Sequence, residues 1–549
     1  MPKVRVFLFI IFISVLGASC AKRGSITGGP KDTIAPTIVT STPENMSTNF
    51  KGRKIRIDFS EYIKIKDVNK QLIISPPLKT QPNIVPSGSA SKHIEITIRD
   101  TDTLQPNTTY SFNFGQSITD NNEGNPYSQF RYVFSTGDYI DSLEQNGSIK
   151  DAYTRETDNF VTVMLYEDNE TFNDSTIYKQ KPRYITNTLD SSVTFSLQNL
   201  KAGKYRLFAL KDVSNNYVYN PKSDKLAFLK NAITVPSDSV YQLKLFKEKG
   251  AFKAIKPTMA SSNRLYAGYE GDDPKGIKAV VKNGTGTETL KTMVTNVADK
   301  DSVQIWLPRG LKADSLQVQV SRLDSVKNFI VKYKEMKATD SLTVEAVQKG
   351  GLHFREQFTL KPSTPLVTID QTRMALVNKD SVAIPFTQAY DDFNQQLVFD
   401  FVKDENQKYT FTLMPGALTD FYGKANDTLT YALSTRTYAD YGNLQVNLKN
   451  VKRYPLLLEL TDAKGKVYAS TYVESEAVIH FDAVSPNKYV IRVIYDDNKN
   501  RVWDTGNYME KLQPEEVIYL PDERNPAVIK EVDVRELWDV EQDFNLGGK

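Results

Sequence analysis

The sequence contains few of the residues that most often carry chemistry in proteins. Cys20 is the single cysteine among 549 residues, and the three histidines are His93, His353 and His480. A lone cysteine allows no disulfide within the chain, so the domains must be stabilised by hydrophobic cores. The histidines stand far apart, and their spacing matches neither a zinc site nor a catalytic triad. His480 lies on an expected strand, where we predict a hydrogen-bonded sheet residue.

Motifs of the common enzyme classes are also missing. The chain has no Gly-x-Ser-x-Gly nucleophile elbow, no P-loop and no His-Glu-x-x-His zinc motif. Its 66 acidic residues could include a catalytic pair, but no local pattern singles one out. We therefore expect a protein that is not an enzyme.

The sequence lacks a charge imbalance and, beyond its N-terminus, a long apolar run. Lys and Arg total 69 against 66 Asp and Glu, which gives a net charge of +3. This near-balance argues against a strongly charged partner, and we expect no binding to nucleic acid. After Leu16 no apolar run approaches the roughly 20 residues of a membrane helix, so only the N-terminus should touch lipid.

The N-terminal segment has the pattern of an export signal. Lys3 and Arg5 precede the apolar residues 6–16, and a Gly-Ala-Ser stretch leads to Cys20. A basic head, about 7–15 apolar residues and a small-residue cleavage site are typical of a signal peptide. We therefore predict a signal peptide over residues 1–19.

A cysteine directly after such a segment resembles the lipobox of bacterial lipoproteins, although Gly17 stands where leucine is usual. The resemblance implies that Cys20 carries fatty acyl chains such as palmitate, whereas the alternative is a secreted protein with an unmodified cysteine. Each buried methylene contributes about 0.8 kcal/mol, so two or more chains would anchor the protein in the outer membrane. Residues 20–33 would form a flexible tether. The tether lacks the acidic run often linked to surface export, so the periplasmic and cell-surface faces both stay open.

The rest of the chain has the composition of a β protein. It contains 29 Tyr and 27 Phe with many Val, Ile and Thr. Turn residues recur about every 8–12 positions, and long helical periodicity is almost absent. We therefore predict an all-β fold of tandem antiparallel β-sandwich domains, about three to five in number.

Residues 34–137 alternate apolar and polar positions as strands do. Ile55, Ile57 and Phe59 would share one face of a strand. The stretches TGGPKDT, SPP, NTTYSFNFG and YVFSTG resemble the Ig-like domain that opens a group of Bacteroidota-type lipoproteins. They are also similar to bacterial Ig-like domains of surface-layer proteins. The resemblance implies a sandwich without enzymatic activity.

The next units are β-rich as well. Residues 142–249 resemble the transthyretin-like or carboxypeptidase-regulatory sandwich, and residues 250–344 are predicted to be a connecting β domain. Both earlier patterns then recur in order: Tyr110-Ser-Phe112 has a counterpart in Tyr409-Thr-Phe411, and Lys204-Tyr205 in Lys488-Tyr489. This predicts a duplicated two-domain module, although generic strand patterning could produce the same recurrence. The duplicated units are a second Ig-like domain at 345–437 and a second transthyretin-like domain at 438–541, followed by a tail at 542–549.

One loop in the last unit has the ligand spacing of a calcium site, with oxygen donors at alternate positions. The donors are the side chains of Asp496, Asn498, Asn500 and Asp504 and the backbone carbonyl of Val502. Two positions depart from an EF-hand, which needs glycine at Arg501 and glutamate at Asn507. The alternative is an Asx-rich turn whose side chains cap their own backbone. Calcium is the one cofactor for which the sequence offers a candidate, and the related loop at 212–220 is poorer in charge.

Two further patterns concern the surface. Asp-Ser/Thr-aliphatic triplets resemble the O-glycosylation sequon of Bacteroidota-type exported proteins, although Asp-Ser also commonly precedes a strand. The central residues are Thr33, Thr103, Ser142, Ser239, Ser302, Ser315, Ser325, Ser341, Ser381 and Thr428. Aromatic residues near loop ends could form an exposed binding platform, whereas strand-edge tyrosines are the alternative. They are Tyr217, Tyr219, Tyr438, Tyr441, Trp503 and Tyr508.

The sequence therefore favours a non-catalytic, outer-membrane-anchored lipoprotein. Five β domains in series would form a rigid arm, acting as a scaffold or protein-interaction subunit of an envelope complex. The family resemblance suggests a role accessory to outer-membrane protein assembly (BAM-type) or to surface-lipoprotein export, with an outer-membrane β-barrel as partner. The alternative function is a surface glycan-binding or adhesion lipoprotein.

Overall fold

The computed structural model describes residues 32–188, 192–271, 274–284, 286–336 and 340–547. Within them the chain is built almost entirely of strands, and the fold class of tandem β-sandwich domains is confirmed. The helical elements described are α2 (Val68–Gln71) and the 3-10 helices η1 (Thr176–Tyr178), η2 (Gln371–Arg373) and η3 (Tyr438–Asp440). None of these helices has the length and apolar character needed to cross a membrane. Cys20, the predicted signal peptide and most of the tether lie outside the described residues.

Domain I is a sandwich of two sheets with orders β1-β2-β5-β4, where β7 also pairs with β2, and β3-β6-β8. Its core follows the period of two, because Ile55, Ile57, Ile94 and Ile96 are fully buried while the residues between them reach solvent. The strands are β1 (Ile38–Thr42), β2 (Lys54–Ile65), β3 (Ile73–Ser75), β4 (Asn83–Val85), β5 (Ser91–Thr97), β6 (Thr109–Asn113), β7 (Ile118–Asp120) and β8 (Arg131–Ser135).

Domain II has sheets β11-β10-β13-β14, where β15 also pairs with β13, and β12-β9-β16. Strands β9 and β16 run parallel, so this sandwich is not purely antiparallel. Domain II packs on domain I, where the Lys181 ammonium donates to the Leu78 carbonyl over 2.8 Å. The strands are β9 (Leu143–Asp151), β10 (Thr162–Glu167), β11 (Tyr184–Asn187), β12 (Thr194–Leu200), β13 (Gly203–Lys211), β14 (Lys225–Phe228), β15 (Ile233–Val235) and β16 (Tyr241–Leu245).

Domain III has sheets β17-β19-β22-β21, where β18 also pairs with β19, and β20-β23-β24. Its core contains the fully buried Trp306, whose indole N–H donates to Thr295 Oγ1 over 2.8 Å. The strands are β17 (Lys253–Ala254), β18 (Thr258–Ser261), β19 (Arg264–Glu270), β20 (Lys278–Asn283), β21 (Met293–Asn296), β22 (Ser302–Trp306), β23 (Ser315–Arg322) and β24 (Ser325–Lys332).

Domain IV has sheets β25-β27-β31-β30, β26-β34-β32-β29 and the pair β28-β33. Phe358, Phe399 and Phe411 form the centre of its core, with ring centroids 4.4–6.0 Å apart. The strands are β25 (Val344–Ala346), β26 (Gly350–Gly351), β27 (Phe358–Pro362), β28 (Leu366–Ile369), β29 (Met374–Asn378), β30 (Thr387–Asp391), β31 (Gln396–Asp400), β32 (Lys408–Leu413), β33 (Leu418–Asp420) and β34 (Leu429–Ser434).

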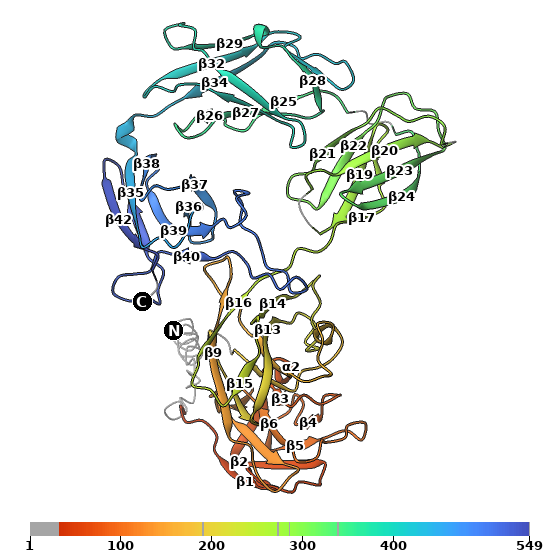
Figure 1. Ribbon diagram of the computed structural model, residues 1–549, viewed down its shortest axis with the longest axis vertical. Coiled ribbons are helices and arrows are strands. Elements are labelled where there is room, and N and C mark those ends of the chain that lie inside the picture. Colours follow the sequence, from red (N-terminus) through yellow and green to blue (C-terminus); the bar gives the residue numbers. More distant parts are fainter. Residues whose placement is uncertain (1–31, 189–191, 272–273, 285, 337–339, 548–549) are drawn as a thin grey trace, which may run out of the picture.

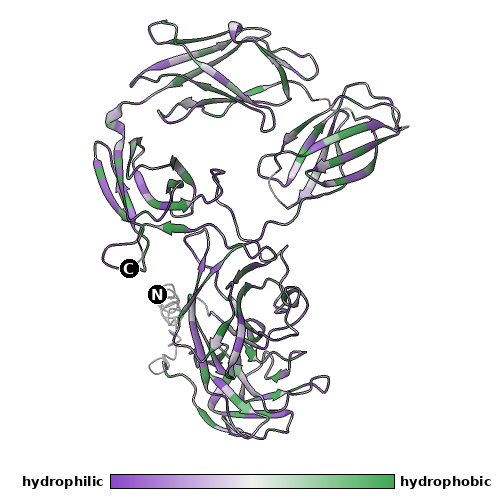
Figure 2. Ribbon diagram, in the orientation of Figure 1, coloured by the Kyte–Doolittle hydropathy of each residue, from purple (hydrophilic) through white to green (hydrophobic). Residues whose placement is uncertain are grey.

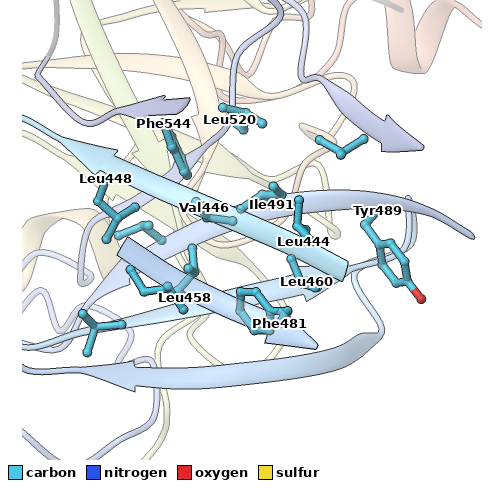
Figure 3. Packing of buried hydrophobic residues seen from close by; sticks show 14 of the residues in the cluster. Leu444, Val446, Leu448, Leu458, Leu460, Phe481, Tyr489, Ile491, Leu520 and Phe544 are labelled. Carbon is cyan, nitrogen blue, oxygen red and sulfur yellow. The ribbon is translucent and has the colours of Figure 1, made fainter. Parts of the chain in front are cut away.

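Domain V has sheets β37-β36-β39-β40, where β41 also pairs with β39, and β38-β35-β42. Leucine, valine and aromatic side chains from both sheets meet between them (Figure 3). Residues 542–545, which the sequence predicted as tail, belong to the parallel strand β42, and Phe544 is fully buried because it fills this core. The strands are β35 (Gly442–Lys449), β36 (Leu456–Thr461), β37 (Val467–Val473), β38 (Val478–Val484), β39 (Asn487–Tyr495), β40 (Val517–Tyr519), β41 (Glu531–Val534) and β42 (Asp539–Asn545).

The strand order repeats within the chain. Every pairing of domain II has a counterpart in domain V, including the parallel pair β9–β16, which corresponds to β35–β42. Domains I and IV also correspond, with β2 divided into β27 and β28. Even a small detail recurs, since the parallel bridge between Ser47 and Phe134 matches the pairing of Gly350 with Leu433. This agreement is what a duplicated two-domain module predicts.

The domains do not form the extended arm that the sequence analysis predicted. From domain II the chain passes through domains III and IV, and in domain V it returns to contact domain II (Figure 1). Hydrophobic and hydrophilic residues alternate along most strands, as expected when each sheet has one buried and one outer face (Figure 2). Domains II and V contact each other through outer faces of their sheets. This contact closes domains II, III, IV and V into a frame.

Candidate functional site

The predicted calcium loop begins the connection between β39 and β40, residues 496–516, which we call the clasp. Asp496 is 1% exposed, and its carboxylate accepts the backbone N–H groups of Asn500 over 3.1 Å and Arg501 over 2.8 Å. The Asp504 carboxylate accepts the side-chain amides of Asn498 and Asn500, both over 2.6 Å. These bonds are those of an Asx-rich turn that caps its own backbone.

Metal binding by this loop remains a prediction. Among the described residues no group of three or more His, Cys, Asp or Glu is placed to hold a metal ion. Val502, the predicted carbonyl ligand, has an exposed side chain and donates its N–H to Asn500 Oδ1 over 2.9 Å. The related loop at 212–220 is capped in the same way, because the Asp212 carboxylate accepts the N–H groups of Ser214 and Tyr217.

Glu515 closes the clasp, and sequence reasoning missed it. Its carboxylate accepts the N–H of Asp497 over 2.8 Å and that of Asp504 over 2.9 Å, which ties the two ends of the loop together. Burial raises the pKa of Glu515, and the nearby Asp504 and Asp496 charges raise it further against the opposing hydrogen bonds. Glu515 lies outside the run of alternating oxygen donors in the sequence. No local pattern therefore indicated that it would close the loop.

Aromatic side chains of the clasp pack on the outer face of the sheet β11-β10-β13-β14 in domain II. Tyr508 is 2% exposed, and its ring centroid lies 5.5 Å from that of Phe208 and 5.2 Å from that of Phe228. Trp503 packs on Tyr153 at 4.6 Å. The clasp therefore supplies part of a hydrophobic layer that domain II leaves incomplete.

Polar contacts and close packing fix the position of the clasp. Thr505 Oγ1 donates to the Lys247 carbonyl over 2.7 Å, and the Gln513 amide donates to the Phe228 carbonyl over 2.9 Å. A Cβ atom at Gly506 would lie 2.7 Å from the Phe246 ring, so only glycine allows this approach. The clasp thus fits domain II in one geometry.

Domain II also contacts domain V through Tyr153. Arg492, 1% exposed on β39, donates to Glu459 over 2.7 Å and to the Tyr153 hydroxyl over 2.7 Å. The Tyr519 hydroxyl donates to the Tyr153 carbonyl over 2.7 Å. A buried guanidinium is stable only when its donors are satisfied, and here both domains contribute partners.

The six aromatic residues considered for a binding platform are mostly not exposed. Tyr217, Tyr219, Tyr441 and Tyr508 are buried, and Trp503 is half-buried. Four of the six residues, Tyr217, Tyr219, Trp503 and Tyr508, belong to the layer that covers the outer face of domain II, which is why they leave solvent. Tyr438 alone is well exposed, at 54%, and it stacks on Phe354 with centroids 4.5 Å apart.

The other predicted sites lie apart from the clasp. None of the ten predicted O-glycosylation residues is buried: Ser302, Ser315 and Ser325 are half-buried and the others are exposed. His93 and His480 lie on β5 and β38. His353 lies at the junction of domains IV and V, where its Nδ1 accepts the N–H of Arg355 over 3.0 Å and its ring meets Tyr441 edge-on.

The same junction holds a cleft of about 890 Å³. One wall comes from domain IV, the other from domain V and the short connection between them. Its charged and tyrosine side chains are His353, Arg355, Glu356 and Arg436 on the first wall and Tyr441, Tyr468, Tyr489 and Glu536 on the second.

Comparison with known proteins identifies the first domain. Residues 32–136 match a family model described as bacterial Ig-like domain. The chain therefore contains a bacterial Ig-like domain. The match covers domain I and confirms the Ig-like domain expected at residues 34–137. A search of curated proteins found no match.

Several solved structures are similar to parts of this chain. The S-layer protein rSbsC(31-844) is 11% identical over 90% of this chain and 68% of that chain, with a TM-score of 0.16. A biofilm-associated protein BSP domain is 8% identical over 75% of this chain and 99% of that chain, with a TM-score of 0.15. Tandem Ig repeats of Dlar are 12% identical over 34% of this chain and 98% of that chain, with a TM-score of 0.13.

Proposed function

We propose that this protein is a non-catalytic, lipid-anchored scaffold of an outer-membrane complex. The observation that carries the proposal is the docking of domain V on domain II through the clasp. Domains joined by flexible linkers normally move relative to one another unless their interface is large and apolar. Here Tyr508 and the Arg492–Tyr153 contact join the two ends of the four-domain series, which favours a rigid frame.

A rigid frame suits a protein that holds partners in a fixed arrangement. The Ig-like fold is used mainly for presenting surfaces, and function on such a fold is carried by particular sites. Anchoring through Cys20 would place domain I nearest the membrane and domains III and IV at the far side of the frame. The partner we propose is an outer-membrane β-barrel engaged in protein assembly or in surface-lipoprotein export.

The anchor is tested by replacing the one residue on which it depends. Cys20→Ser should leave the protein unlabelled by radioactive palmitate and release it from outer-membrane fractions, whereas Ser19→Ala, beside it, should keep label and location. A labelled Cys20→Ser protein, or wild-type protein without lipid, would contradict the anchor.

The scaffold role is tested by recovering partners from membranes. Native protein solubilised in mild detergent is isolated by an affinity tag, and its partners are quantified by mass spectrometry. We expect one outer-membrane barrel in constant ratio to the bait, and a reduced ratio for a Gly506→Val variant that opens the frame. Recovery of the protein alone would count against the role.

A further inference from the structure

We propose that the cleft between domains IV and V binds an acidic saccharide, with Arg355 and Arg436 holding its carboxylate. The site is independent of the scaffold role, because it uses neither the clasp nor the lipid anchor. The cleft offers such a ligand two arginines without an ion-pair partner, an exposed tyrosine ring and walls in which polar side chains outnumber apolar ones.

The two guanidinium groups are available to a ligand. Within the described residues, neither Arg355 nor Arg436 has a carboxylate in ion-pair distance or a side-chain hydrogen bond. Arg355 lies 5.2 Å over the Phe481 ring, a stacking contact that covers one face and leaves the N–H groups at its edge free. Such a planar fork matches a carboxylate through two parallel hydrogen bonds.

The lining of the cleft also holds two carboxylates, Glu356 and Glu536, and Asp482 attracts Arg355 electrostatically, so the two arginines are cationic groups in a cleft of mixed charge. Burial lowers the pKa of His353, so its ring is neutral at pH 7. Because its Nδ1 accepts the N–H of Arg355, the neutral ring also holds the backbone that carries this guanidinium. Glu356 accepts the N–H of His353 over 3.3 Å, whereas Glu536 is exposed on the opposite wall. Glu536 can accept hydrogen bonds from hydroxyl groups.

The tyrosines favour a sugar over a simple anion. Tyr441, Tyr468 and Tyr489 line the cleft, and of the three it is Tyr468, 45% exposed, that presents its ring, whereas Tyr441 and Tyr489 are buried. A tyrosine offers an apolar ring face for the C–H groups of a pyranose and a hydroxyl at its edge. The Tyr489 hydroxyl is used internally, since it donates to the Ser485 carbonyl over 2.7 Å.

The walls also favour a saccharide over a peptide. Interfaces with proteins depend on apolar anchors that fill pockets, whereas the arginine, glutamate, histidine, serine and tyrosine side chains of this cleft outnumber its apolar ones, which are Leu352, Ala469, Val484 and Pro486. Many donors and acceptors at one place suit a polyhydroxylated ligand. A carboxylate on that ligand would pair with the guanidinium groups.

The test is calorimetric titration of the full-length protein in detergent with oligogalacturonate, at about 0.15 M salt to suppress non-specific attraction. We expect binding, and about tenfold weaker binding by Arg355→Gln and by Arg436→Gln, since each removes charge-assisted hydrogen bonds. Tyr468→Ala should also weaken it. Arg524→Gln, an exposed arginine on the β40–β41 connection, is the matched control and should bind as wild type.

Two comparison ligands distinguish recognition of the sugar from attraction to its negative charge. A neutral dextran oligosaccharide should not bind, and poly-glutamate of similar charge should bind more weakly than oligogalacturonate. Absence of oligogalacturonate binding, unchanged affinity in both arginine variants, or equal affinity for poly-glutamate would each overturn the proposal. Circular dichroism of every variant shows whether it keeps the wild-type fold.

Discussion

Replacing Tyr508 with alanine removes the most deeply buried aromatic side chain of the clasp. Its ring packs against Phe208 and Phe228, and its backbone N–H donates to the Glu248 carboxylate across the interface. Truncation of a buried aromatic residue costs about 3–5 kcal/mol. Because the lost contacts join two domains, the loss should weaken docking rather than unfold either core. We expect the free energy of opening to fall by about 3 kcal/mol, more than a hundredfold in the opening equilibrium.

Hydrogen exchange followed by mass spectrometry measures this opening directly. Peptides that cover residues 503–513 should exchange more than a hundredfold faster in Tyr508→Ala, while the strands of domain I stay protected. Tyr508→Phe keeps the ring and loses the 3.3 Å bond to Asp174, so its exchange should change by less than tenfold. Tyr438→Ala, an exposed tyrosine, is the control. Wild-type exchange rates in Tyr508→Ala would refute docking through this side chain.

Four other outcomes are expected. Gly506→Val should open the clasp because its Cβ would meet the Phe246 ring, whereas Gly351→Ala, which has open space around it, should have no effect on exchange. Arg492→Met should destabilise the protein by about 3–5 kcal/mol in urea unfolding by leaving Glu459 buried without its partner, and adding Glu459→Met should recover most of the loss. The pKa of His353 lies below its ordinary 6.5 because burial disfavours the charged ring. The unfolded chain therefore takes up this proton first, and the free energy of unfolding should decrease as the pH falls below about 6.5; His353→Gln should lessen that dependence in melting curves at pH 7.5 and 5.5. Calcium at 100 times its dissociation constant would add about 2.7 kcal/mol to stability, so an unchanged melting temperature in excess calcium would remove the metal prediction.

Sequence patterns were most informative where structure depends on near neighbours. Alternation of Ile55 and Ile57 with charged residues predicted a half-buried strand, because successive side chains of a strand point to opposite faces. The recurrence of Tyr110 and Phe112 as Tyr409 and Phe411 predicted the second Ig-like unit. The same local logic explains the loop at Asp496, whose Asx residues cap their own backbone in the structure.

The candidate cleft could not be anticipated in this way. Arg355 and Arg436 lie on different connections of domain IV, and neither is near Tyr468 in the sequence. Nothing in the spacing of these residues indicates that they share a wall or face each other. Their meeting depends on how domain V packs against domain IV, through contacts such as that of Arg355 with Phe481.

Local patterns thus predicted the strands, the cores and the duplicated order of domains. They could do so because alternate side chains of a strand point to the buried and the outer face of its sheet. Which residues cover the outer faces depends on contacts between residues that are far apart in the sequence. Tyr217 and Tyr508 looked like surface aromatics because a single sandwich would leave them in water. Tyr217 is buried beside residues 74–81 of domain I, and Tyr508 is buried because the last domain returns to the second. In both places apolar surface that no single domain can hide is removed from water when two domains meet.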